Sequence, residues 1–301
     1  MTTQSTHWQH QFIQTNQIRL HYVTQGEGEL VVLLHGFAEF WYSWRYQLPT
    51  LARHFKVVIP DLRGYNDSDK PESGYDIDTL SADIVGLIQN LGYQCAHVVG
   101  HDCGGMIAWN LAQKFPQYLQ NLVLLNAPPP QRLVQEFAST LDQWRRNWYL
   151  LALQIPGLPE QLLQLNLQQF LRDWFQKQAI RKAPFSNETM QIYQAALEKT
   201  GVLSAVSHYY RQLMSPQSWL PKLDRPSLPI QVPTLVLWGE DDTVLSPSLA
   251  QGLDQLIQAP FRLKLVPDCG HWIQQEVPRV VNRELLDFFR KEPSFQLVTG
   301  D

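Results

Sequence analysis

Residues 98–106 read VVGHDCGGM, and this stretch decides the fold more than any other. A short apolar run leads into a Gly-x-Asp-x-Gly turn, and a helix-capable segment follows from Met106 to Lys114. Gly100 and Gly104 are small enough to let the chain turn sharply between the two. The stretch therefore predicts a buried strand, a tight turn and a helix, with the side chain of Asp102 raised above the edge of a sheet.

The aspartate at the centre of this turn determines the chemistry. A strand, sharp turn and helix form the nucleophile elbow, in which serine hydrolases place a serine. Serine needs a base to become nucleophilic, whereas a carboxylate with an ordinary pKa of about 3.9 is already an anion at neutral pH. Asp102 therefore predicts direct attack on carbon and a covalent ester. A glycine-flanked turn in which aspartate merely caps the helix is the alternative.

The bulk composition is that of a soluble globular protein. The 301 residues are 44% hydrophobic and 17% charged, enough for one large domain or a domain with an insertion. The net charge is −4 and the basic residues are scattered, so nothing favours nucleic acid or an anionic membrane as a partner. Three cysteines without close pairing argue against a disulfide framework and fit a reducing compartment.

The termini and the apolar runs give no sign of targeting. The first seven residues lack a basic region followed by an apolar one, so no secretory signal is expected. No uninterrupted apolar run approaches the roughly 20 residues of a membrane span. We therefore expect a cytoplasmic protein.

Short apolar runs alternate with helix-capable stretches through the first part of the chain. The run at 18–23 alternates as a half-exposed strand does, and the later runs are continuous, as in strands buried on both faces of a parallel sheet. This alternation predicts a mostly parallel, doubly wound α/β sheet. The runs are residues 18–23, 30–34, 57–59, 98–99 and 122–125, and the clearest helical stripe lies in 77–91.

The pattern changes after Pro130. From about Gln131 to Asp224 the spacing of apolar and aromatic residues is helical, and strand-like runs resume at 234–238 and 263–266. We therefore predict an α/β core formed by residues 1–130 and 226–301, interrupted by a helical lid over 131–225.

Two further segments supply partners for Asp102. Residues 239–243 read GEDDT after one predicted strand, and His271 lies on the loop after the next. Such folds build their sites at the carboxyl ends of strands. The order nucleophile, acid, histidine is that of the α/β-hydrolase triad. Each residue alone has a structural explanation, but the three together predict a catalytic triad, with the acid among Glu240, Asp241 and Asp242.

An oxyanion hole is expected beside the nucleophile. In this triad arrangement it uses the amide after the nucleophile and an amide from the loop after the third strand. Residues 35–38, HGFA, follow a predicted strand directly. The backbone N–H groups of Phe37 and Cys103 are therefore the candidate donors.

These motifs together resemble the epoxide hydrolases of the α/β-hydrolase superfamily, over nearly the whole chain. The resemblance lies in residues 35–45 (HGFAEFWYSWR), 61–65 (DLRGY), 100–105 (GHDCGG) and 269–272 (CGHW). It implies that Asp102 is the nucleophile, that His271 activates water, and that Asp242 orients the histidine.

The resemblance also assigns residues in the lid. The family holds the epoxide oxygen with two lid tyrosines, one upstream of a Pro-Gly and one before an arginine. Tyr149 fits the first position, and Tyr210 fits the second, with Tyr209 as a one-residue alternative. Lid aromatics imply an apolar pocket for aryl or alkyl epoxides. The candidates for substrate binding are Trp41, Trp148 and Trp272.

Two positions depart from the family pattern. The family usually has proline where Ala38 stands, often after a cis bond, and a cis bond before alanine would cost about 2.5–4 kcal/mol. A trans bond and a differently aimed loop are therefore expected. The family also usually has tryptophan at Cys103, but only the backbone amide is needed there.

The resemblance implies hydrolysis of an epoxide to a vicinal diol, with water as the second substrate and no metal or organic cofactor. His101, Asp102 and Cys103 are adjacent and do not easily converge on one ion. A haloalkane or haloacid dehalogenase is the first alternative, although Cys103 and Phe37 stand where such enzymes usually carry halide-binding Trp and Asn. A non-catalytic ligand-binding protein of the same fold is the second. The oligomeric state is left open.

Overall fold

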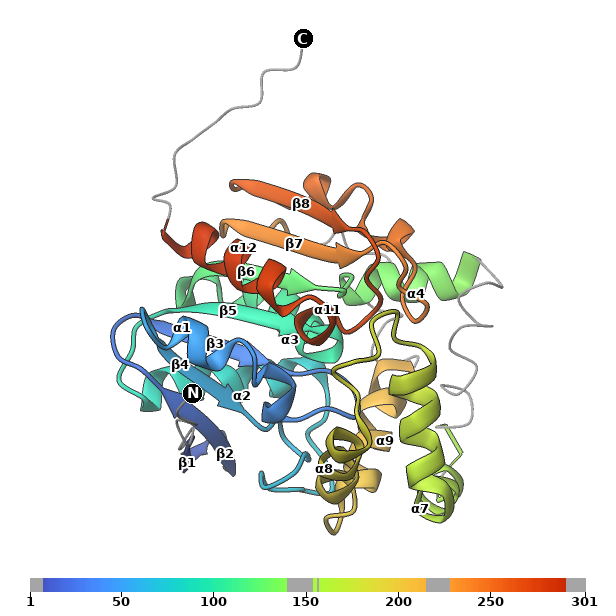
Figure 1. The fold of residues 1–301 in the computed structure, drawn as a ribbon. Coiled ribbons are helices and arrows are strands. Elements are labelled where there is room, and N and C mark those ends of the chain that lie inside the picture. Colours follow the sequence, from blue (N-terminus) through green and yellow to red (C-terminus); the bar gives the residue numbers. More distant parts are fainter. Residues whose placement is uncertain (1–7, 140–153, 156, 215–227, 291–301) are drawn as a thin grey trace, which may run out of the picture.

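The structure is a computed structural model that describes residues 8–139, 154–155, 157–214 and 228–290 (Figure 1). Its centre is one eight-stranded sheet in the order β1-β2-β4-β3-β5-β6-β7-β8. The first two strands pair antiparallel, β2 also pairs antiparallel with β4, and the remaining neighbours are parallel. The strands are β1 (Gln9–Thr15), β2 (Ile18–Gln25), β3 (Leu30–Leu34), β4 (Lys56–Pro60), β5 (Ala96–His101), β6 (Leu119–Leu125), β7 (Thr234–Gly239) and β8 (Phe261–Val266). The predicted mostly parallel α/β sheet is confirmed.

Helices cover both faces of the sheet (Figure 1). One layer contains α1 (Leu48–Leu51), α11 (Ile273–Glu276) and α12 (Pro278–Arg290), and the other contains α2 (Ile77–Asn90) and α3 (Asp102–Lys114). With both faces covered, strands β3, β5 and β7 are buried along their whole length, which explains their continuous apolar runs. Short 3₁₀ turns lie at η1 (Trp41–Trp44), η2 (Pro116–Tyr118), η4 (Pro247–Ala250) and η5 (Leu253–Leu256).

The parallel strands end in register at one edge of the sheet. Leu34 pairs with Gly100, and His101 pairs with Leu125. Leu125 in turn pairs with Leu237. The loops that carry Phe37, Asp102 and the acidic residues after β7 therefore start from neighbouring points.

The described part of the segment between β6 and β7 consists mainly of helices. It contains α4 (Pro130–Ser139), α7 (Leu158–Leu171), the π-helical η3 (Arg172–Lys177), α8 (Asn187–Leu197) and α9 (Val202–Met214). Helices α7, α8 and α9 pack together at the carboxyl ends of the strands (Figure 1). The predicted inserted lid is confirmed as part of the fold, while its limits at 131 and 225 stay a prediction.

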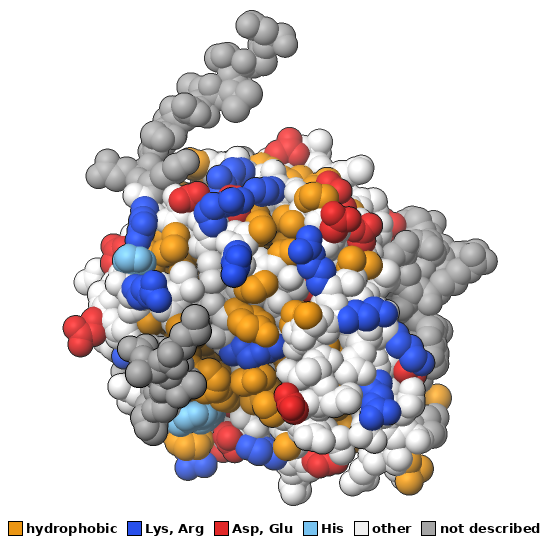
Figure 2. Space-filling model, viewed as in Figure 1, with side chains coloured by type: hydrophobic (Ala, Val, Ile, Leu, Met, Phe, Trp, Pro, Cys, Tyr) orange, Lys and Arg blue, Asp and Glu red, His pale blue; other side chains and the backbone are white. Residues whose placement is uncertain are grey.

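The surface carries no single dominant charge on the face drawn in Figure 2, where basic and acidic side chains are interspersed with apolar ones. Within the described ranges, no helix combines the length and the apolar character needed to cross a bilayer.

Candidate active site

Asp102 lies at the sharp turn between β5 and α3, as the sequence predicts. Its φ is +48°, in the left-handed region that non-glycine residues avoid. The flanking glycines serve a different purpose, because a Cβ on Gly100 would lie 2.4 Å from the carbonyl oxygen of Gly104, and one on Gly104 would lie 2.5 Å from that of Leu34. The glycines thus allow close packing of α3 on β3 and β5, while the strained conformation falls on Asp102 itself.

The carboxylate of Asp102 is buried between two functional groups. Its Oδ2 accepts a hydrogen bond from the backbone N–H of Phe37 at 2.9 Å. Its Oδ1 lies 3.9 Å from Nε2 of His271, an ion-pair distance that is too long for a hydrogen bond. The nucleophile, the oxyanion-loop amide and the histidine predicted from the sequence therefore meet at one point.

His271 is oriented by Asp242. Nδ1 of His271 donates to Oδ2 of Asp242 at 2.9 Å. The backbone N–H groups of Val244 and Leu245 donate to Oδ1 of Asp242 at 2.7 and 2.8 Å, and the Asn126 amide donates to Oδ2 at 2.7 Å. These partners satisfy both carboxylate oxygens of the buried Asp242 and hold it in place. Glu240 and Asp241, the other acids of this loop, are exposed.

The environment of His271 favours its protonated form. Burial lowers the pKa of the imidazole, but the charge and hydrogen bond of Asp242, together with the charges of Asp102 and Glu39, raise it to about 9. Two of these carboxylates flank the ring on opposite sides, at Nδ1 and Nε2. Loss of the charge on Asp102 would therefore lower the pKa of His271.

The oxyanion loop takes an unusual path at Ala38. No peptide bond in the described part of the chain is cis, and Ala38 has a φ of +57°. A proline ring fixes φ near −65°, so the residue that the family usually has here could not adopt this conformation. The loop agrees with the expected trans bond, and the amide of Phe37 still reaches Asp102.

The two adjacent tyrosines of α9 point in different directions. The hydroxyl of Tyr210 lies 3.6 Å from Sγ of Cys103, and its ring packs edge-on against Phe37 at 4.9 Å. The hydroxyl of Tyr209 instead donates to the carbonyl of Arg63 at 2.7 Å. Tyr210 therefore lies beside Cys103, the residue that follows Asp102, whereas Tyr209 is bound to the scaffold.

Cys103 remains a thiol in this position. Burial raises its pKa well above the ordinary value, and the neighbouring Asp102 carboxylate raises it further. Because the thiolate is the reactive form of cysteine, the Cys103 side chain next to Asp102 is expected to be a poor nucleophile.

The predicted substrate-binding residues have different surroundings. Trp272 packs against Trp174, Phe175 and Phe185 of the lid, with ring centroids 5.0–5.8 Å apart. Trp41 packs against Trp8 and His10 of the N-terminal segment and against Phe40 and Tyr42 next to it. Tyr149 and Trp148 lie outside the described residues, and all four assignments stay predictions.

The sequence analysis missed a buried pair beneath the site. Glu39 accepts hydrogen bonds from the Gly36 amide at 2.8 Å and from Nδ1 of His101 at 2.9 Å. His101 in turn donates from Nε2 to the carbonyl of His271 at 2.9 Å. Burial raises the pKa of Glu39, but the charge and hydrogen bond of His101 outweigh this and lower it. The sequence does contain a sign of this pair, because Glu39 is an acid within the otherwise apolar run 36–41 and lies two residues after Phe37, the predicted oxyanion donor.

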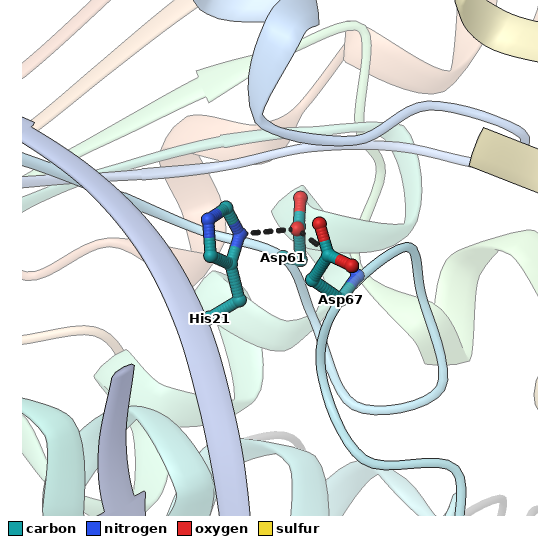
Figure 3. A group of neighbouring side chains, drawn as sticks. All are labelled: His21, Asp61 and Asp67. Carbon is teal, nitrogen blue, oxygen red and sulfur yellow. Dashed lines mark hydrogen bonds and ion pairs between the residues drawn. The ribbon is translucent and has the colours of Figure 1, made fainter. Parts of the chain in front are cut away.

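A second polar cluster lies between β2 and the turn after β4 (Figure 3). The side chains of His21, Asp61 and Asp67 converge within 4.8 Å, close enough to suggest cation ligands. However, Nδ1 of His21 already donates to Asp61 at 2.6 Å, and Asp67 binds the Lys199 ammonium at 2.6 Å. The other oxygen of Asp61 accepts from the Trp41 amide. These bonds identify the cluster as a scaffold that joins β2 to the turn after β4.

Comparisons with known proteins agree with this geometry. Residues 29–278 match the family described as alpha/beta hydrolase fold. The chain is 38% identical to AB hydrolase superfamily protein YfhM of Bacillus subtilis (strain 168), covering 94% of this chain and 98% of that protein. It is 35% identical to epoxide hydrolase 3 of Xenopus tropicalis, covering 96% and 80%. The crystal structure of Bacillus megaterium epoxide hydrolase with an inhibitor superposes with a TM-score of 0.82 at 30% identity, covering 93% and 100%.

Proposed function

The chain belongs to the epoxide hydrolase family of α/β-hydrolase fold proteins, and we propose that it hydrolyses epoxides to vicinal diols through a covalent ester on Asp102. The observation that carries this proposal is the Asp102 carboxylate on a strained elbow, 3.9 Å from a histidine that Asp242 orients. A carboxylate needs no base to attack carbon, so this arrangement assigns the histidine to a later step.

In the first step, Asp102 attacks an epoxide carbon from the side opposite the ring oxygen. The carbon–oxygen bond of the ring breaks, and Tyr210 together with Tyr149 donates hydrogen bonds to the oxygen as it gains charge. The contact between Tyr210 and Cys103 supports this role for Tyr210, because it holds the hydroxyl next to the residue that follows the nucleophile. The ring oxygen takes a proton from one of these hydroxyls, which regains one from solvent, and the product is a hydroxyalkyl ester.

In the second step, His271 takes a proton from water, and the resulting hydroxide attacks the carbonyl carbon of the ester. Formation of the ester removes the charge of Asp102, which is one of the causes that raise the pKa of His271. A larger fraction of the histidine is therefore neutral, the form that can accept a proton, at the moment when a base is needed. The Phe37 and Cys103 amides stabilise the oxyanion of the tetrahedral intermediate. Its collapse breaks the ester carbon–oxygen bond, the departing diol oxygen takes the proton from His271, and the carboxyl group loses its proton to solvent to restore the carboxylate.

The substrate side of the site is apolar. Phe37 packs edge-on against Trp174 at 5.2 Å and against Phe170 at 6.2 Å, which supports aryl or alkyl epoxides as substrates. We assign residues 131–225 to the lid and the flanking segments to the core. The three free thiols support a reducing, cytoplasmic location.

The test is intact mass spectrometry of His271→Gln after separate incubation with terminal epoxides and with haloalkanes. We expect a mass gain equal to the whole epoxide, located on Asp102 by peptide mapping, because ester formation survives without the histidine. Asp102→Asn, the matched control, should gain nothing. A gain equal to an alkyl group without its halogen would instead identify a dehalogenase. Folded protein without adduct across the panel would contradict the proposal.

A further inference from the structure

One carboxylate joins the lid to the loop of His271. Glu276, at the end of α11, is buried with 5% of its surface exposed. Its Oε2 accepts hydrogen bonds from the backbone N–H groups of Ile180 at 3.1 Å, Arg181 at 2.9 Å and Gly270 at 3.1 Å. Its Oε1 accepts from the N–H of Trp272 at 3.2 Å. The four donors come from two segments about 90 residues apart. One is lid segment 180–181, and the other is the loop that carries His271.

The lid side of this junction is irregular backbone. Residues 178–186 connect η3 to α8 outside any helix or strand, and the amides of Ile180 and Arg181 donate to Glu276 instead of to a helical carbonyl. The same segment makes further contacts with the core, where Nε of Arg181 donates to the carbonyl of Asp268 at 2.8 Å and Nη2 of Arg45 donates to the carbonyl of Pro184 at 3.0 Å.

The histidine side is equally dependent on Glu276. Gly270 and Trp272 flank His271 directly, and both of their amides end on this one carboxylate. A Cβ on Gly270 would lie 2.9 Å from Oε1 of Glu276, so the loop passes close against the carboxylate. Glu276 does not touch the reacting atoms, and it acts on His271 only through the neighbouring backbone.

We propose that Glu276 is a positioning residue that couples the docked lid segment 180–181 to the placement of His271. The inference rests on the proposed function, because it concerns the histidine of the same reaction. Since His271 acts only on the ester, loss of the coupling slows ester hydrolysis and leaves ring opening nearly unchanged. The carboxylate thus links the docked lid segment 180–181 to the second half of the reaction.

The experiment compares Glu276→Gln with the unaltered enzyme in single turnovers of styrene oxide or 1,2-epoxyoctane, whichever the unaltered enzyme hydrolyses faster. Acid quenching and intact mass spectrometry give the rates of ester formation and decay. The glutamine keeps the volume but turns an N–H₂ group toward backbone donors. We expect ester decay to slow on the order of tenfold, with ester formation within about threefold, so that the ester accumulates.

Glu284→Gln is the matched control. Glu284 is an equally buried glutamate on α12, but it pairs with Lys264 and Arg262 rather than with the catalytic loops. Both rates should be unchanged in this variant. Arg181→Ala, which removes only the bond to Asp268, provides a milder second variant if Glu276→Gln does not fold, and it should also slow ester decay selectively.

The inference would be overturned if Glu276→Gln slowed both steps equally, or if neither Glu276→Gln nor Arg181→Ala slowed ester decay. It would also be overturned if Glu284→Gln slowed ester decay selectively. Failure of the proposed function has a different signature, because then the unaltered enzyme forms no diol and His271→Gln forms no ester.

Discussion

Nε2 of His271 and Oδ1 of Asp102 face each other across 3.9 Å, near enough to attract and too far to share a hydrogen bond. The separation matters because, in the proposed mechanism, the two residues act in succession on the same substrate. In the free enzyme the carboxylate favours protonated histidine, and in the ester that carboxylate charge no longer exists. In the proposed reaction, ester formation therefore shifts His271 toward its neutral form, which can act as a base.

The first prediction concerns this shift. In Asp102→Asn, removal of the carboxylate charge should lower the pKa of His271 below the value of about 9 that it has in the free enzyme. The Asp242 hydrogen bond remains and keeps part of the elevation. NMR titration of the His271 ring, assigned with His271→Gln, measures both values, and an unchanged pKa would contradict the argument.

The same raised pKa predicts how stability depends on pH. The folded-state pKa of His271, about 9, lies above its ordinary value of 6.5, so its protonation stabilises the folded state fully below pH 6.5. This contribution is lost as the pH rises through about 9. Urea unfolding between these limits should show a fall in the free energy of unfolding that His271→Gln lacks. A parallel fall in both proteins would assign the effect to other groups.

The two tyrosines of α9 should separate in their effects. Tyr210→Phe removes a hydroxyl that lies beside Cys103, and should slow ester formation on the order of 10²-fold while leaving unfolding nearly unchanged. Tyr209→Phe leaves the Arg63 carbonyl without its partner, and should cost about 1–3 kcal/mol of stability with little effect on ester formation. Stopped-flow kinetics and urea unfolding measure the two quantities. The opposite pattern would make Tyr209 the residue that contacts the epoxide.

Ala38 provides a test of the oxyanion loop. Its φ of +57° costs an alanine about 1 kcal/mol, so Ala38→Gly should raise the free energy of unfolding by roughly that amount. Ala38→Pro forces φ to about −65° and should destabilise the fold and slow ester hydrolysis, because the neighbouring Phe37 amide moves away from Asp102. Thermal unfolding and ester decay rates measure these effects. A proline variant with unchanged stability and rate would show that the loop tolerates both paths.

Thiol reactivity should distinguish the three cysteines. Burial and the Asp102 charge raise the pKa of Cys103, and burial and the Glu276 charge raise that of Cys269. Cys95 is only half-buried. At pH 8, iodoacetamide should therefore modify Cys95 alone, whereas all three should react in urea. Peptide mapping after brief labelling identifies the sites, and rapid modification of Cys103 in the folded protein would show an exposed or ionised thiol.

The elbow and the triad could be predicted because their signals are local. The run into Asp102 carries its strand, its turn and its helix within a few residues, and His271 and the acidic loop follow strands directly. Strand β1 gave no such signal, since QHQFIQT is exposed on most of both faces and lacks an apolar stripe. Only pairing with β2 defines it.

Other features depend on tertiary contacts that no local pattern contains. Glu39 forms a hydrogen bond with His101, 62 residues away in the sequence, and no residue near Glu39 identifies that partner. The choice between Tyr209 and Tyr210 depends on how α9 docks, because adjacent helical residues differ by about 100° in direction. The sequence analysis linked the glycines around Asp102 to the sharp turn, whereas they permit close packing of α3 and the positive φ falls on Asp102, which only the backbone reveals.

That positive φ has an evolutionary consequence. A non-glycine residue in the left-handed region costs on the order of 1–3 kcal/mol, and at position 102 this cost is borne by the one side chain that makes the ester. Glycine would relieve it and abolish the reaction. A mutant library of this chain selected only for thermal stability should therefore enrich glycine at position 102. The most stable variants would then lack the carboxylate that forms the ester.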